Sequence, residues 1–165
     1  MVSWSVARGG PELAPSERDL VLSALRHFDG VRYRLHSAVV MNDHVHALLT
    51  PASDHPLSKI LQSWKSFTAH QLVRNGRTAP VWNANYFDQM IRDEVHFAKA
   101  LIYIERNPWK RWPDLGSYPW MIPPLSTGPT HTPHTRIDPT SSDRDPMDPD
   151  PLDSDPVDPG PPGPV

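Results

Sequence analysis

Two histidines separated by one residue, His44 and His46, are the side chains of this sequence whose types and spacing best suit metal chemistry. They open an apolar run, with Val45 between them, and this pattern predicts a buried strand. Side chains alternate between the two faces of a strand, so both imidazoles are expected on one face and Val45 on the other. Two neutral imidazoles on a rigid strand form half of a divalent-metal site. Because the pattern is short, the alternative is one histidine that ends a strand and one that is merely exposed.

The segments around this strand predict the sheet that must hold it. Asn42-Asp43 favours a tight turn, because both residues tolerate left-handed backbone and bond to their own main chain. We therefore expect Val45–Thr50 to pair antiparallel with Leu35–Val40. Alternating residues predict two further strands, at Val2–Val6 and, on an edge, over residues 87–91.

Three segments show the apolar spacing of helices. The first should begin at Pro15-Ser16, with Ser16 as its N-cap, and end at Asp29-Gly30. The second runs from Leu57 to Arg74, with an apolar stripe that includes Phe67. The third follows Asp93, its predicted N-cap, and should end at Pro108.

The third predicted helix has two faces of different character. The face expected to be buried carries Val95, Ala98, Leu101, Ile102 and Glu105. Another face carries His96, Lys99, Tyr103 and Asn107. After this helix, the aromatic segments 109–113 and 118–120 are expected to pack as a lid onto the domain, and they also suit stacking on unpaired nucleic-acid bases.

Composition divides the chain at residue 125. Residues 126–165 hold 11 prolines and 8 aspartates with few apolar residues, which predicts a disordered acidic tail. Residues 1–125 carry 14 Lys and Arg against 11 Asp and Glu, a net charge of +3, whereas the tail carries 2 against 8, a net charge of −6. The overall charge of −3 thus hides a mildly basic domain, 1–125, which is compatible with a nucleic-acid partner.

Several classes of protein are disfavoured by what the sequence lacks. There is no cysteine, which excludes disulfides and thiolate metal sites. No apolar run approaches the length of about 18 residues that a membrane span needs, and no secretory pattern opens the chain. We expect a protein of the cytoplasm, without membrane contact.

Four segments, in this order, resemble one known family, the REP-associated tyrosine transposases, which are single-tyrosine members of the HUH endonuclease superfamily related to insertion-sequence transposases. The segments are Val39-Val40-Met41-Asn42-Asp43-His44-Val45-His46, Ser63-Trp64-Lys65-Ser66-Phe67, the run of residues 81–94, and Ile102-Tyr103-Ile104-Glu105-Arg106-Asn107-Pro108. The resemblance covers roughly residues 2–120. It implies an α+β fold with a central antiparallel sheet and flanking helices, the ferredoxin-like or RRM-like arrangement of HUH nucleases.

The resemblance also implies a site and a reaction. His44, His46 and Asn107 would bind Mg²⁺ or Mn²⁺, and Tyr103 would attack a phosphate of hairpin-forming single-stranded DNA, of the kind found in REP-like repeats. The product would be a 5′-phosphotyrosine link and a free 3′-OH. Candidate DNA contacts are Lys59, Lys65, Arg74, Arg92 and Lys99. The protein would act at the nucleoid, as a monomer or a homodimer.

Alternatives remain for these roles. Tyr103 is otherwise a core tyrosine on an amphipathic helix, and Tyr86, in a predicted exposed turn, is a rival nucleophile. The alternative for Asn107 is that it is only the residue before Pro108 at the end of a helix. The alternative for the cations of the second helix is that they form a solvated face without a ligand. At the level of the protein, the main alternative is a domesticated relative that binds DNA hairpins without cutting them. An RNA-recognition module would instead need aromatic residues on its central strands, where this sequence has imidazoles.

Overall fold

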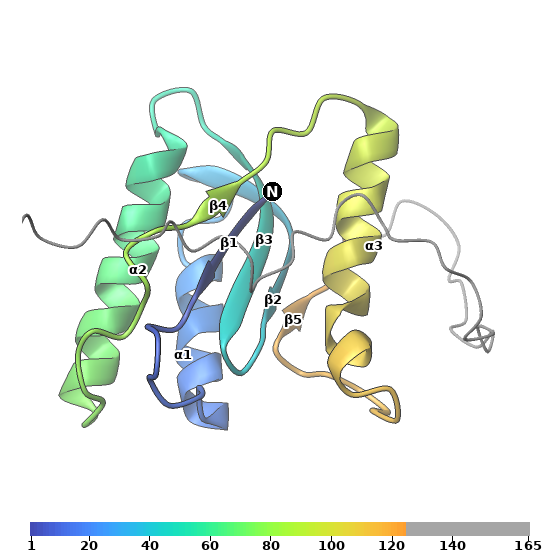
Figure 1. Cartoon of the computed structure of the whole chain (residues 1–165). Helices are drawn as coiled ribbons and strands as arrows, with labels where there is room; N and C mark the ends of the chain where they lie inside the picture. The colour runs from blue at the N-terminus through green and yellow to red at the C-terminus, as the bar shows by residue number, and fades with distance from the viewer. Residues whose placement is uncertain (125–165) are drawn as a thin grey trace, which may run out of the picture. The chain divides into compact units, whose positions relative to one another are not determined.

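The computed structural model of the protein describes residues 1–124, which form an antiparallel sheet with three helices (Figure 1). The elements are, in chain order, β1 (Val2–Ser5), α1 (Pro15–Arg26), β2 (Tyr33–Val40), β3 (His44–Pro51), α2 (Leu57–Arg74), β4 (Phe87–Asp88), α3 (Glu94–Arg111) and β5 (Met121–Ile122). The predicted α+β class is confirmed. The predicted disordered tail, 126–165, and the predicted boundary at residue 125 lie outside the described residues.

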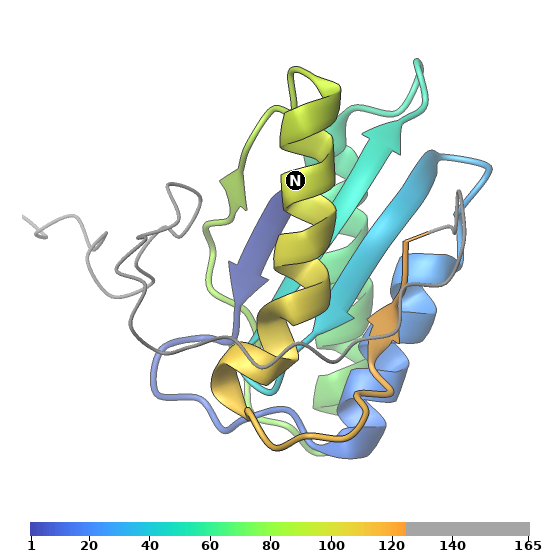
Figure 2. The same cartoon turned by 90° about the vertical axis from the view of Figure 1, so that its right-hand side faces the viewer.

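The sheet has the strand order β4-β1-β3-β2-β5, and every pair of neighbours is antiparallel. The first four strands of this order have the ferredoxin-like arrangement that was predicted, and β5 extends the sheet beside β2. Figure 2 shows α3 lying in front of the sheet, with α1 and α2 behind it. The sheet is thus covered on both faces, and β3 lies at its centre.

The β2–β3 hairpin forms with the predicted pairing, in which Val40 lies opposite Val45 and Val39 opposite His46. The register shifts by one residue between Leu35 and Ser37, which makes a β-bulge that the sequence pattern did not indicate. The bulge changes which positions of β2 face α1 and α2. Core residues on that face are odd-numbered before the bulge and even-numbered after it: Tyr33, Leu35, Ala38 and Val40.

An aromatic cluster fills the core between the sheet and α2. Trp64 of α2 stacks on Trp4 of β1, with ring centroids 5.9 Å apart, and its indole N–H donates to the Tyr33 hydroxyl at 3.0 Å. The hydroxyl of buried Thr68 accepts from the indole N–H of Trp82 at 2.9 Å and donates to the Trp64 carbonyl at 2.7 Å. The Trp64 and Trp82 indoles are therefore buried with their donors hydrogen-bonded, whereas the Trp4 indole nitrogen is buried without a partner.

Two details of the first helices differ from the sequence prediction. Helix α1 starts two residues earlier than expected, because its N-cap is Ala14 and Pro15 occupies the first helical position. The Glu17 carboxylate accepts from the Ala14 N–H at 2.8 Å. Pro15 fixes the helical φ and needs no donor there, so Ser16 is not the cap. In α2, Phe67 is 50% exposed and Thr68 takes the buried position, because the Trp82 indole requires an acceptor at that point.

The prediction for α3 was wrong in its buried face and in its end. The residues that face the sheet are Ala100, Tyr103, Ile104, Asn107 and Pro108, whereas Val95 and Ile102 are 66% and 48% exposed. Ala98 and Glu105 are exposed too, and Leu101 is half-buried. The sheet face opposite α3 is partly polar, so the helix docks through its mixed face and not through its more apolar one.

Pro108 lies inside α3, which continues to Arg111. The last turn is closed by the Trp112 N–H, which donates to the Pro108 carbonyl at 2.8 Å. A proline inside a helix removes one backbone hydrogen bond and crowds the carbonyl four residues earlier, and the burial of Pro108 and Asn107 against the sheet offsets this cost in α3. The other end is as predicted, since the Asp93 carboxylate caps the helix by accepting from the His96 N–H at 2.7 Å.

The segment after α3 packs back onto the domain, as predicted. The Tyr118 ring stacks on Trp112, and its hydroxyl donates to the Val40 carbonyl at 2.7 Å. Trp120 lies under the Arg18 guanidinium, 3.6 Å from its ring centroid. These aromatic side chains therefore attach the end of the domain to α1 and β2.

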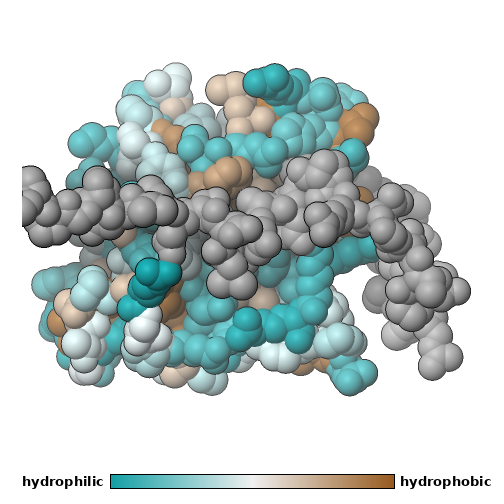
Figure 3. Space-filling model, viewed as in Figure 1, coloured by the Kyte–Doolittle hydropathy of each residue, from teal (hydrophilic) through white to brown (hydrophobic). Residues whose placement is uncertain are grey.

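The part of the surface that is visible in Figure 3 is mainly hydrophilic, with scattered apolar side chains. The larger exposed apolar residues come from several elements and include Val31, Phe67, Met90, Val95 and Ile102. Within residues 1–124, no helix is both long enough and apolar enough to cross a membrane.

Replacing Thr68 by Val should destabilise the domain by about 1–3 kcal/mol, because a buried donor, the Trp82 indole N–H, loses its acceptor. Urea unfolding of the two proteins measures the difference. The matched control is Thr78→Val, since Thr78 is exposed. Equal stability of Thr68→Val and the wild type would show that the indole N–H needs no acceptor.

Candidate active site

Strand β3 presents His44 and His46 to the face of the sheet that α3 covers. Val45 and Ala47 point the other way, into the core with α1 and α2, so alternation leaves the two histidines on the α3 side. Their rings lie 4.7 Å apart between centroids, at an interplanar angle of 75°. Because Ser5 pairs with His44 and Ser3 with His46, β1 places two hydroxyl residues beside the imidazoles.

Helix α3 brings Tyr103 and Asn107 to this histidine pair. The Tyr103 ring lies edge-on to His46, with centroids 5.2 Å apart. Asn107, one turn further along the helix, places its Oδ1 3.2 Å from His44 Nε2. The four residues that the sequence singled out as metal ligands and nucleophile therefore meet in one place.

His46 is a buried ionisable group of the site. It is 8% exposed, and its Nδ1 is buried without a hydrogen-bond partner. Burial, and then the nearby His44 and Lys110, lower the pKa of His46 well below its ordinary value of 6.5. The imidazole is therefore neutral at physiological pH, and the neutral form is the one that binds metals.

The Asp43 carboxylate contacts Nδ1 of His44, the ring nitrogen that does not face Asn107. Its Oδ1 lies 2.7 Å from His44 Nδ1, and this hydrogen bond lowers the pKa of the Asp43 carboxyl. The other ring nitrogen of His44, Nε2, lies 3.2 Å from the Asn107 Oδ1, so each nitrogen of this imidazole is within hydrogen-bond distance of an oxygen.

Two imidazoles and one amide oxygen are a donor set that can hold a divalent metal ion. Among residues 1–124, no three His, Cys, Asp or Glu side chains gather in a way that would hold a metal ion. A third protein ligand in this part of the chain must therefore be an amide, hydroxyl or carbonyl oxygen, and Asn107 offers an amide oxygen next to His44.

Sequence reasoning missed two cations near the site, Lys110 and Arg111. The Lys110 ammonium lies 4.5 Å from the centroid of the Tyr103 ring, and Arg111 Nη1 lies 3.5 Å from Asp43 Oδ2. Because the helix was expected to end at Pro108, these two residues were not assigned to it. With the helix continued, Lys110 falls seven residues after Tyr103, on the same face.

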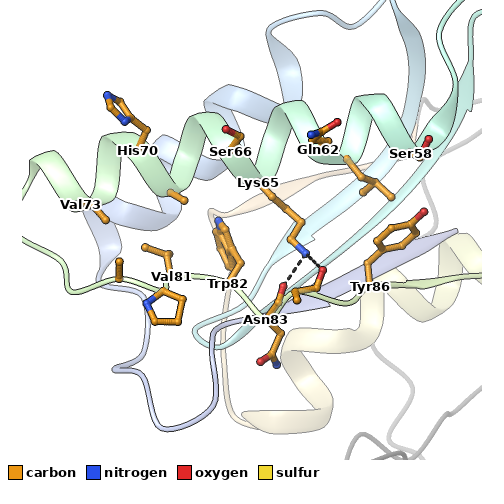
Figure 4. Close-up of a pocket in the computed structure, with 15 residues that line it drawn as sticks. Ser58, Gln62, Lys65, Ser66, His70, Val73, Val81, Trp82, Asn83 and Tyr86 are labelled. Atoms are coloured by element: carbon orange, nitrogen blue, oxygen red, sulfur yellow. Dashed lines mark hydrogen bonds between the residues drawn. The ribbon is translucent and has the colours of Figure 1, made fainter.

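The predicted DNA contacts of α2 lie on the opposite side of the sheet from the histidines. Lys59 and Arg74 are exposed on this helix. The Lys65 ammonium donates to the backbone carbonyls of Asn83 and Ala84, at 2.7 and 2.9 Å, in a hollow of about 630 Å³ between α2 and the segment 79–86 (Figure 4). Burial lowers the pKa of Lys65. Its contacts hold a loop in place.

The remaining predicted residues have different surroundings. Lys99 is exposed on α3, and Arg92 is exposed just before that helix. Tyr86, the rival nucleophile, is 39% exposed and lines the hollow beside α2, as Figure 4 shows. It is Tyr103, and not Tyr86, that contacts the histidine pair.

A comparison with protein families identifies the chain. Residues 24–107, about half of the sequence, match the family described as Transposase IS200 like. The chain belongs to the IS200-like transposase family. The matched range includes His44, His46, Tyr103 and Asn107. The match confirms the transposase family that the sequence motifs indicated.

The fold of this IS200-like protein is also that of a solved transposase. The structure of the REP-associated tyrosine transposase bound to a REP hairpin matches with a TM-score of 0.57 and 19% sequence identity. The match covers 67% of this chain and 66% of the other, so the chain spans just under two thirds of that transposase. A comparison with curated proteins gave no match.

Replacing Lys65 by Met should loosen the segment 83–85, because its carbonyls lose their shared donor. We expect a loss of stability of roughly 1 kcal/mol, since the site is partly solvated. Urea unfolding and limited proteolysis of this segment measure the effect. Lys59→Met is the matched control, on the same helix. If both variants leave stability unchanged and lower DNA affinity equally, Lys65 acts as a phosphate contact instead.

Proposed function

We propose that this protein cleaves and rejoins single-stranded DNA, with Tyr103 as the nucleophile. The observation that carries the proposal is the meeting of Tyr103 and Asn107, one helical turn apart on α3, with His44 and His46 on β3. The family of the chain supports DNA processing, since its members are described as transposases.

The proposed step is a transfer of a phosphoryl group from DNA to the enzyme. The Tyr103 oxygen attacks the phosphorus of a backbone phosphate and forms a new phosphorus–oxygen bond, while its proton is released. The bond from phosphorus to the 3′-oxygen breaks, and this oxygen leaves as a free 3′-OH after taking up a proton. The 5′-phosphotyrosine link conserves the energy of the broken bond, so the reverse step can join another 3′-OH.

His44, His46 and Asn107 are the residues that would hold a metal ion, Mg²⁺ or Mn²⁺. When bound, the ion would polarise the scissile phosphate and offset its developing charge. The chain contributes a neutral His46, a His44 whose Nε2 faces the Asn107 oxygen, and a Lys110 ammonium over the Tyr103 ring. A single copy supplies all of these side chains, so a monomer already contains the site.

The proposed substrate is DNA that folds into hairpins, as in REP-like repeats. The support is the similarity in fold to a transposase whose structure contains a REP hairpin, together with the net charge of +3 of residues 1–125. Such a substrate would place the protein at the nucleoid.

Tyr103→Phe should abolish the covalent adduct between protein and DNA, because it removes the attacking oxygen. The purified protein is incubated with a labelled library of hairpin-bearing single strands and Mn²⁺, and adducts are resolved on a denaturing gel. Tyr86→Phe is the matched control and should retain the adduct. Hairpin binding without any adduct in the wild type would favour the non-catalytic hairpin-binding alternative, and loss of the adduct only in Tyr86→Phe would overturn the assignment of the nucleophile.

Adduct formation should also require a divalent metal ion. Treatment with a chelator should abolish it, and added Mn²⁺ should restore it in the wild type but not at the same concentration in Asn107→Ala. The thermal unfolding midpoint of the variant is measured alongside, because Asn107 is buried. An adduct that persists in the chelator would rule out metal assistance.

A further inference from the structure

We propose that Asp43 is a positioning residue, which fixes His44 in the tautomer that carries its proton on Nδ1 and thereby keeps the Nε2 lone pair available. This inference deepens the proposed function, because it concerns the residue that would bind the metal ion. Asp43 was predicted only as a turn residue, and no comparison assigns it a role.

The geometry gives the two oxygens of Asp43 different partners. Oδ1 lies 2.7 Å from His44 Nδ1, and Oδ2 lies 3.5 Å from Arg111 Nη1. Arg111 also contacts the Glu12 carboxylate at 3.2 Å through its other terminal nitrogen. The carboxylate is therefore held from two sides, by the residue that follows it and by the last residue of α3.

The contact with Asn107 shows why His44 needs such a partner. Its Nε2 lies 3.2 Å from the Asn107 Oδ1, so a proton on Nε2 would find an acceptor already in place. In that tautomer the amide would consume the nitrogen that the metal ion requires. Asp43 opposes this outcome, because an ionised carboxylate is a stronger acceptor than an amide oxygen. A carboxylate that accepts from Nδ1 of a histidine also makes Nε2 a better metal ligand.

The chain offers a matched control pair outside the site. Asp54 precedes His55 just as Asp43 precedes His44, and its Oδ1 lies 2.8 Å from His55 Nδ1. This pair lies in the connection between β3 and α2, where Asp54 is 76% exposed. Removing Asp54 therefore deletes the same type of contact without touching the histidine pair.

The first test is direct observation of the tautomer. Nitrogen-15 NMR spectra of the histidine rings are recorded on metal-free protein at pH 8, for the wild type, Asp43→Ala, Asp43→Asn and Asp54→Ala. We expect the Nδ1–H tautomer for His44 in the wild type and in Asp54→Ala, and a shift to the Nε2–H tautomer in Asp43→Ala. Asp43→Asn should retain part of the wild-type signal, since its amide oxygen still accepts. An unchanged His44 tautomer in Asp43→Ala would overturn the proposal.

The second test is the affinity for Mn²⁺, measured by the decrease of the free-ion EPR signal during titration. Asp43→Ala should bind Mn²⁺ about 10–100-fold more weakly than the wild type, and Asp54→Ala should bind it equally well. Equal weakening in both alanine variants would contradict a specific role for Asp43. If the wild-type protein does not bind Mn²⁺ at all, the metal part of the proposed function fails, and the tautomer measurement still decides the role of Asp43.

Discussion

The site depends on one constraint, the alternation of side chains along the central strand β3. Burial of Val45 and Ala47 against α1 and α2 forces His44 and His46 to the other face, so the packing that stabilises the domain also fixes the imidazoles. The strand has neighbours on both sides, which prevents it from slipping in register. A shift by one residue would bury both histidines in the apolar core and lose the site and the fold together.

Helix α3 supplies the second half of the site because it packs through a mixed face. Ala100 and Ile104 give this face enough apolar surface to dock, while Tyr103 and Asn107 lie between and after them and meet the histidines. A more apolar stripe exists on the same helix, with Val95 and Ile102, and it stays exposed. The helix therefore gives up some hydrophobic burial and gains a polar contact surface, an exchange typical of functional sites.

The two histidines of the site have different electrostatic surroundings. His46 is enclosed and neutral, whereas His44 is bonded to an ionised carboxylate at the β2–β3 turn. Lys110 and Arg111, from the last turn of α3, place positive charge over Tyr103 and beside Asp43. On the other side of the sheet, Lys65 uses its ammonium to hold a loop. Cations of the same type thus serve different purposes, according to the surface on which the fold places them.

The sequence by itself determined the β2–β3 hairpin and the shared face of His44 and His46, since these follow from local alternation and turn chemistry. The four motifs, read as a resemblance, also indicated the family and, through it, the fold class. Only the tertiary structure decided which face of α3 is buried, because two faces of that helix carry apolar residues and the polar sheet surface selects between them. The tertiary structure also decided that α3 continues past Pro108, since packing against the sheet outweighs the local preference of proline to end a helix. This continuation places Lys110 beside Tyr103 and Arg111 beside Asp43.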